Sequence, residues 1–205
     1  MTITAGLGYN LKVKKGDDKS MQKKSQKALK NMVLSALFIS IGLVLPFLTG
    51  QLKQIGNMLL PMHLPVFLCG LICGWKYGAA VGLVLPLLRS MLFSMPVLYP
   101  TAISMAFELS AYGLICGLIY ALFKKQNAGK IYPALVISML GGRAVWGIAQ
   151  AVLLGVKDNA FTLKMFVTGA FVNALPGIVI QLVIIPLIME ALHRTNLHRY
   201  KNENE

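Results

Sequence analysis

Residues 56–117 read GNMLLPMHLPVFLCGLICGWKYGAAVGLVLPLLRSMLFSMPVLYPTAISMAFELSAYGLICG and contain three apolar segments with almost no room between them. Only residues 75–77 and 94–99 interrupt the hydrophobic character. Three ionisable residues lie well inside the apolar segments: His63, Arg89 and Glu108. Transfer of such groups into hydrocarbon costs several kcal/mol unless they are paired or hydrated. We therefore expect these residues to serve a function within a membrane.

The composition of the whole chain also indicates an integral membrane protein. Hydrophobic residues make up 56% and charged residues 13% of the 205 residues, whereas a soluble domain has about 25% charged residues. The formal net charge of +13 would suit a nucleic-acid partner only if basic residues gathered on one folded face. They gather instead at the ends of apolar segments. We therefore expect no nucleic-acid partner and interpret the charge as a topology signal.

The apolar runs predict an all-α fold, a compact bundle of six transmembrane helices in the lipid bilayer. A hydrocarbon core of about 30 Å needs about 20 helical residues. Six segments of roughly this kind cover residues 31–48, 58–74, 78–93, 99–123, 131–156 and 165–192. The second and third are short, which favours tilted or irregular helices. We expect residues 1–24 to be a basic disordered extension, residues 25–199 the transmembrane domain and residues 200–205 a tail.

The distribution of lysine and arginine predicts the orientation of the bundle. With six spans both termini lie on one side, and basic residues are retained in excess on the cytoplasmic side. Fifteen basic residues fall on the side of the termini: Lys12, Lys14, Lys15, Lys19, Lys23, Lys24, Lys27, Lys30, Lys76, Lys124, Lys125, Lys130, Arg194, Arg199 and Lys201. Three fall on the other side: Lys53, Lys157 and Lys164. This bias predicts cytoplasmic N and C termini for a multi-pass membrane protein.

Polar residues of the predicted spans are the candidates for a binding site. Counted from the span ends, the outer half holds His63, Arg89, Trp146, Gln150 and Asn173, whereas Glu108, Arg143 and Gln181 lie nearer the midplane. A buried ion pair between Glu108 and one arginine would account for part of this set without any ligand. The other arginine would then need a bound anion, an ordered water molecule or a position near the membrane surface. For His63, a structural hydrogen-bonded role is the alternative to substrate contact.

The first span carries two small residues one helical turn apart, Ala36 and Ser40. Small residues on one face let another helix approach closely. This face would serve either ordinary packing inside the bundle or docking onto a partner membrane subunit.

Several chemical functions are excluded by what the sequence lacks. It contains no GxxxxGK[ST] phosphate loop, no HExxH and no GxSxG, so we expect neither ATP hydrolysis nor another enzymatic activity from this chain. The three cysteines, Cys69, Cys73 and Cys116, lack zinc spacing with histidine. We expect no metal and no cofactor.

The stretch LLPMHLPVFLCGLICGWKYGAAVGLVLPLLRS, the basic start before Ala36-Leu-Phe-Ile-Ser40 and the six spans resemble a substrate-binding S component of an energy-coupling factor (ECF) transporter. The resemblance covers about residues 21–199. It implies a location in the bacterial plasma membrane and capture of a water-soluble vitamin or precursor from outside. It also implies partners, namely one coupling membrane subunit and two ATPase subunits. The family's docking motif maps onto Ala36 and Ser40, with Ser40 in place of the family's second alanine.

The sequence leaves the substrate and one competing class of protein open. Two arginines against one glutamate favour a substrate with a carboxylate or phosphate, such as pantothenate, folate, biotin or niacin, over a cation such as thiamine. The competing class is a stand-alone carrier or another polytopic membrane protein. A proton-coupled carrier would use Glu108 as its titrating group and would need no partner.

Overall fold

The computed structural model describes residues 3–48, 60–123, 128–155 and 162–194. The chain divides into two units, residues 1–34 and residues 35–205. Helix α1 (Ile3–Leu48) runs from the first unit into the second. Residues 3–24, for which we expected disorder, are therefore helical in this structure. No proline occurs before Pro46, and the many lysines favour a helix.

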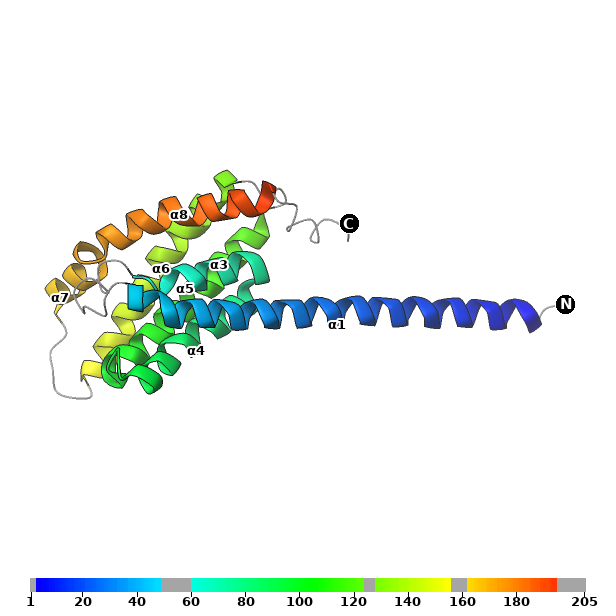
Figure 1. Cartoon of the computed structure of the whole chain (residues 1–205), viewed down its shortest axis with the longest axis horizontal. Coiled ribbons are helices and arrows are strands. Elements are labelled where there is room, and N and C mark those ends of the chain that lie inside the picture. Colours follow the sequence, from blue (N-terminus) through cyan, green and yellow to red (C-terminus); the bar gives the residue numbers. More distant parts are fainter. Residues whose placement is uncertain (1–2, 49–59, 124–127, 156–161, 195–205) are drawn as a thin grey trace. The chain divides into compact units, whose positions relative to one another are not determined.

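The second unit continues with helices only, among the residues that the structure describes (Figure 1). They are α3 (His63–Cys73), α4 (Trp75–Phe93), the π-helical turn η1 (Leu98–Ala102), α5 (Ile103–Leu122), α6 (Ala128–Gly155), α7 (Leu163–Val167), the π-helical turn η2 (Thr168–Val172) and α8 (Leu175–Arg194). The all-α prediction is confirmed, and most predicted boundaries agree with these within a few residues.

Five described helices are long and apolar enough to cross a membrane, namely those over Met21–Phe47, Trp75–Phe93, Leu98–Leu122, Gly129–Gly155 and Leu175–Leu192. The predicted second span corresponds to α3, which has 11 residues and, at 1.5 Å per residue, is about 16 Å long. It ends at Gly74, whose φ of 97° is a left-handed conformation that favours glycine. Because α4 begins at Trp75, α3 and α4 are joined by this single residue.

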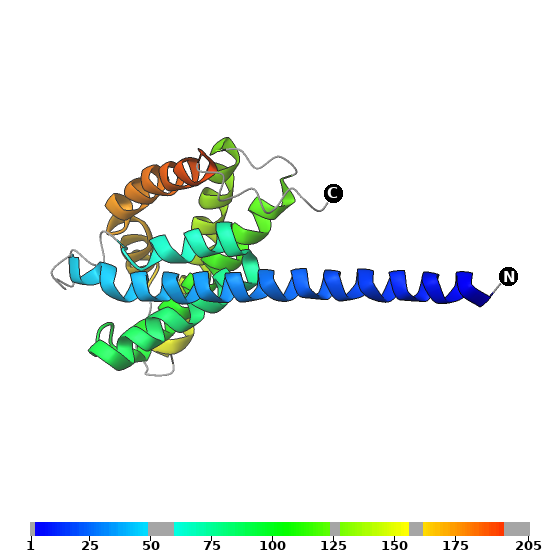
Figure 2. The same cartoon turned by 45° about the vertical axis from the view of Figure 1, so that its right-hand side comes forward.

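Helix α5 lies at the centre of the second unit, because α3, α4 and α6 all pack against it (Figure 2). The contact among α3, α4 and α5 is made by glycines. A Cβ atom added to Gly113 on α5 would lie 2.2 Å from the carbonyl oxygen of Gly78 on α4, and one added to Gly78 would lie 2.7 Å from the Cα of Gly70 on α3. We call Gly70, Gly78 and Gly113 the glycine seam. Here backbone meets backbone, as at other small-residue contacts between membrane helices.

The predicted sixth span is interrupted in the structure. Instead of one helix over residues 165–192, α7 and η2 end at Val172, residues 173–174 form a turn, and α8 begins at Leu175. Pro176 explains the break, because proline has no N–H to donate to the preceding turn and suits the first turn of a helix.

Candidate functional site

A polar cluster is buried where α3, α5 and α6 meet. Arg143 Nη1 on α6 lies 2.8 Å from Glu108 Oε1 on α5. The Tyr112 hydroxyl, one turn along α5, donates to the same oxygen at 2.8 Å. His63 opens α3 with Nε2 3.7 Å from this oxygen, and we call these four residues the Glu108 cluster. Glu108 and His63 are each 2% exposed and Arg143 is 6% exposed, so the ion pair is shielded from solvent.

His63 is the member of the cluster whose polar atoms are left unsatisfied. Within the described part of the chain, neither of its ring nitrogens has a hydrogen-bond partner, since 3.7 Å to Glu108 exceeds hydrogen-bond distance. The ring packs beside Tyr112, with centroids 5.3 Å apart. A neutral imidazole offers one donor and one acceptor, and leaving both unpaired in a buried site costs free energy. The cluster can therefore hydrogen-bond a further polar group through His63.

Arg89 is held away from the Glu108 cluster by different contacts. Its Nη1 donates to the backbone oxygen of Leu43 on α1 at 2.8 Å. Its guanidinium lies 5.3 Å from the ring centroid of Phe47 and 5.4 Å from that of Phe93. Of the two arginines that the sequence left open as partners of Glu108, Arg143 forms the ion pair, and Arg89 has no carboxylate partner in the described part of the chain.

The remaining candidate residues are not gathered around Glu108. Gln150 donates to the Ser104 hydroxyl at 3.1 Å and so links α6 to α5. Trp146 stacks on Phe166 of α7, with ring centroids 6.2 Å apart. Asn173 is exposed at the break before α8. These three polar or aromatic groups therefore lie on contacts between helices or at the surface.

The two small residues of α1 are both exposed. The Ser40 hydroxyl donates to the backbone oxygen of Ala36 at 3.0 Å, so the hydroxyl is satisfied within its own helix. The described residues of the second unit leave this face uncovered.

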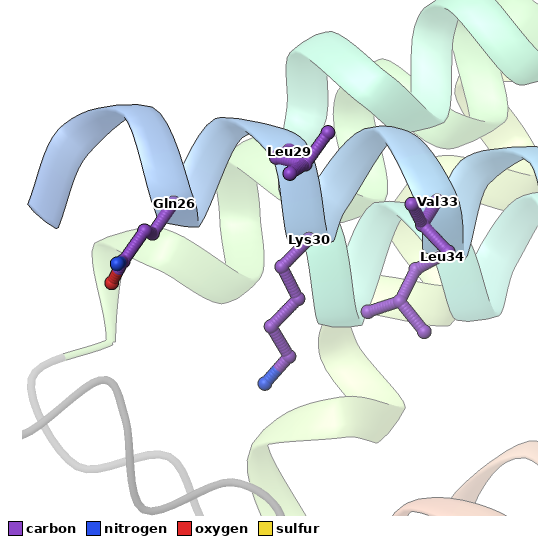
Figure 3. Close-up of a pocket in the computed structure, with 5 residues that line it drawn as sticks. All are labelled: Gln26, Leu29, Lys30, Val33 and Leu34. Carbon is purple, nitrogen blue, oxygen red and sulfur yellow. The ribbon is translucent and has the colours of Figure 1, made fainter. Parts of the chain in front are cut away.

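Elsewhere on α1, Gln26, Leu29, Lys30, Val33 and Leu34 line a groove (Figure 3). All five come from one helix and none belongs to the candidate site. The groove therefore contributes no residue to the Glu108 cluster.

Comparison with known protein families matches residues 30–189 to the family described as ECF transporter, substrate-specific component. The chain belongs to this family. Neither the curated proteins nor the solved structures gave a match. The matched residues contain every candidate site residue and the two small residues of α1. This S component is therefore a membrane transport subunit, as the resemblance implied.

Two further residues, Tyr112 in the Glu108 cluster and Gln181 beside the turn before α3, were not assigned a binding role from the sequence. Tyr112 follows Glu108 by four residues, a spacing that places two side chains on the same helix face, and this signal could have been used. Gln181 on α8 donates through Nε2 to the backbone oxygen of Leu60 at 3.3 Å. No sequence pattern predicts that contact, because the partner is a backbone atom 121 residues away.

Proposed function

We propose that this S component captures a water-soluble vitamin or vitamin precursor from outside the bacterial plasma membrane. A coupling membrane subunit and two ATPase subunits then drive its uptake. One observation supports a binding role most directly, the buried His63 with two unpaired ring nitrogens beside the Glu108–Arg143 ion pair. Unpaired buried ring nitrogens add nothing to the stability of the protein. A substrate that hydrogen-bonds to them would gain binding free energy.

The substrate that we propose carries a carboxylate or phosphate, as pantothenate and folate do. Glu108 already neutralises Arg143, while Arg89 meets a carbonyl oxygen and two aromatic rings. An anionic group would complete the charge balance and would form charge-assisted hydrogen bonds with the guanidinium. We therefore assign the anion to Arg89 and a second polar contact to His63.

The other candidate residues are assigned supporting roles in this proposal. Glu108 and Arg143 hold the cluster together, and Trp146, Gln150 and Asn173 are further candidate contacts on the outer side. We propose that both termini lie in the cytoplasm, which the bias of basic residues supports.

The exposed face of Ala36 and Ser40 is the proposed docking face for the coupling subunit. Its exposure supports this assignment over packing inside the second unit.

Purification of the S component alone in detergent tests the proposal. Mass spectrometry should find a vitamin or precursor bound to it, and liposomes should take up that molecule only when the ATPase module and ATP are supplied. Uptake by the S component alone that collapses with the proton gradient would instead show a proton-coupled carrier using Glu108.

A further inference from the structure

The turn that precedes α3 contains a backbone conformation unusual for its residue. Leu60 has a φ of 50°, in the left-handed region that non-glycine residues rarely adopt. It is 9% exposed, and His63 follows it by three residues. Strained conformations of this kind persist only where the surrounding structure holds them.

Two hydrogen bonds to the Leu60 carbonyl group hold this turn in place. The backbone oxygen of Leu60 accepts the backbone N–H of His63 at 3.1 Å and Nε2 of Gln181 at 3.3 Å. Gln181 comes from α8 and is 1% exposed. The first bond starts α3, and the second ties that start to a helix that is distant in sequence.

The same turn sets where the His63 ring lies. His63 is the first residue of α3, so the backbone conformation of the turn sets the orientation of its side chain. If the Gln181 bond is lost, Leu60 can relax to a negative φ, and the ring can leave its place 3.7 Å from Glu108 and 5.3 Å from Tyr112.

We propose that Gln181 is a positioning residue. By holding the Leu60 carbonyl, it fixes the His63 ring against Glu108 and Tyr112, and α8 thereby controls the group offered to a substrate. The effect of Gln181 on substrate binding rests on the function proposed above, whereas its effect on the position of the His63 ring does not.

Nuclear magnetic resonance of the full chain in detergent, with ¹⁵N-labelled histidine, tests the position of the ring. The sequence has three histidines, and a His63→Gln variant assigns the signals of His63. Gln181→Met keeps the length and volume of the side chain but removes the donor, so it should shift both ring-nitrogen signals of His63. Ser138→Ala, which removes another fully buried polar group whose hydroxyl donates to Leu135 within α6, should leave them unchanged. Unchanged His63 signals in Gln181→Met would overturn the proposal.

Chemical modification provides a second measurement that does not need assigned spectra. Diethyl pyrocarbonate acylates exposed imidazoles, so His63 should react slowly in the wild type and at least about tenfold faster in Gln181→Met, as followed by peptide mass spectrometry. Gln181→Asn, whose amide is too short to reach Leu60, should behave in the same way and replaces Gln181→Met if that variant does not fold. Equal rates in the wild type and the variant would contradict the positioning role.

The proposed function is tested separately in the same preparations. If His63 meets the substrate, both Gln181→Met and His63→Ala should lower the amount of co-purifying small molecule, and the double variant should lose no more than His63→Ala. A further loss in the double variant would show that Gln181 acts by another route and would count against the proposal. A shift of the His63 signals without any change in the co-purifying molecule supports positioning and overturns the substrate role of His63.

Discussion

Two side chains bond to the carboxylate of Glu108, since the Arg143 guanidinium and the Tyr112 hydroxyl both lie 2.8 Å from the same oxygen. A buried charge that loses its partner destabilises a protein by about 3–5 kcal/mol. We therefore expect Arg143→Gln and Glu108→Gln each to lower the unfolding free energy by about this amount, measured by denaturation in detergent. The double variant should be more stable than either single variant, because neither charge is then left alone.

An exposed ion pair provides the control for this prediction. Arg194 and Glu190 lie 3.3 Å apart with the arginine side chain 80% exposed, and exposed pairs contribute little. Arg194→Gln should leave stability nearly unchanged. Equal losses of unfolding free energy for Arg194→Gln and Arg143→Gln would show that burial gives the Glu108–Arg143 pair no larger effect on stability than an exposed pair has.

Arg89 should affect binding rather than the integrity of the ion pair. If it holds an anionic substrate, Arg89→Gln should weaken binding by about 2–5 kcal/mol, the range for truncating one partner of a buried charged pair. Arg89→Lys keeps the charge but loses the planar guanidinium, so its affinity should fall between those of the wild type and Arg89→Gln. Quenching of Trp146 fluorescence by the molecule found by mass spectrometry measures this. Unchanged affinity in Arg89→Gln would point to a neutral or cationic substrate.

At this scale the sequence predicts which residues are polar in an apolar setting, but not which of them meet. The ion pair follows from charge and depth, since Arg143 and Glu108 lie at similar depths. The rotation of each helix about its axis depends on packing details such as the glycine seam, so Gln150 could not be assigned to Ser104 beforehand. The contact of Arg89 with a backbone oxygen was also beyond prediction.

At the scale of elements, the glycine seam sets how α3, α4 and α5 pack. Gly113→Ala would place a methyl group 2.2 Å from the Gly78 oxygen and force the helices apart, at a cost of about 1–3 kcal/mol. Gly129 on α6 has nothing within 4 Å of an added Cβ, so Gly129→Ala should be neutral or slightly stabilising, as alanine favours helices. Thermal unfolding in detergent measures both. Similar melting temperatures for the two variants would contradict the role of the seam.

The docking face is tested by adding bulk where small residues are exposed. Ala36→Trp and Ser40→Trp should abolish co-purification with the ATPase module and energised uptake, while the isolated S component still carries its small molecule. Ile148 on α6 is 66% exposed, and Ile148→Trp provides a control that should leave docking intact. Loss of the small molecule in Ala36→Trp would show that this face supports the bundle instead.

Helix boundaries were predicted well because long apolar runs have few alternatives in a membrane. Two of the discrepancies have local causes. Helix α3 begins at His63 rather than at residue 58, after a turn in which Leu60 has a left-handed φ that hydropathy does not reveal. Pro176 divides the last span although its surroundings are apolar throughout. A proline inside an apolar run can bend a helix or end it, and only the packing of neighbouring helices decides which.

For the whole molecule, the orientation in the membrane is the prediction that matters most. The positions concerned, Lys53, Lys125 and Lys157, lie outside the described residues. Cysteines introduced at 53 and 157 should react with an impermeant thiol reagent added outside, and one at 125 should not, because the bias of basic residues places it in the cytoplasm. The reverse labelling pattern would invert the proposed topology. The native Cys69, Cys73 and Cys116 are buried and should contribute little background.

The glycine seam also restricts how a solute can travel. Where two backbones touch, no space is left for a solute or even a water molecule to pass between the helices. Glycine also has no side-chain rotamers to freeze, so the contact costs no side-chain conformational entropy. At the depth of Gly78 and Gly113 a solute therefore cannot pass between α4 and α5. We expect the parts that move during the proposed capture to lie away from this contact.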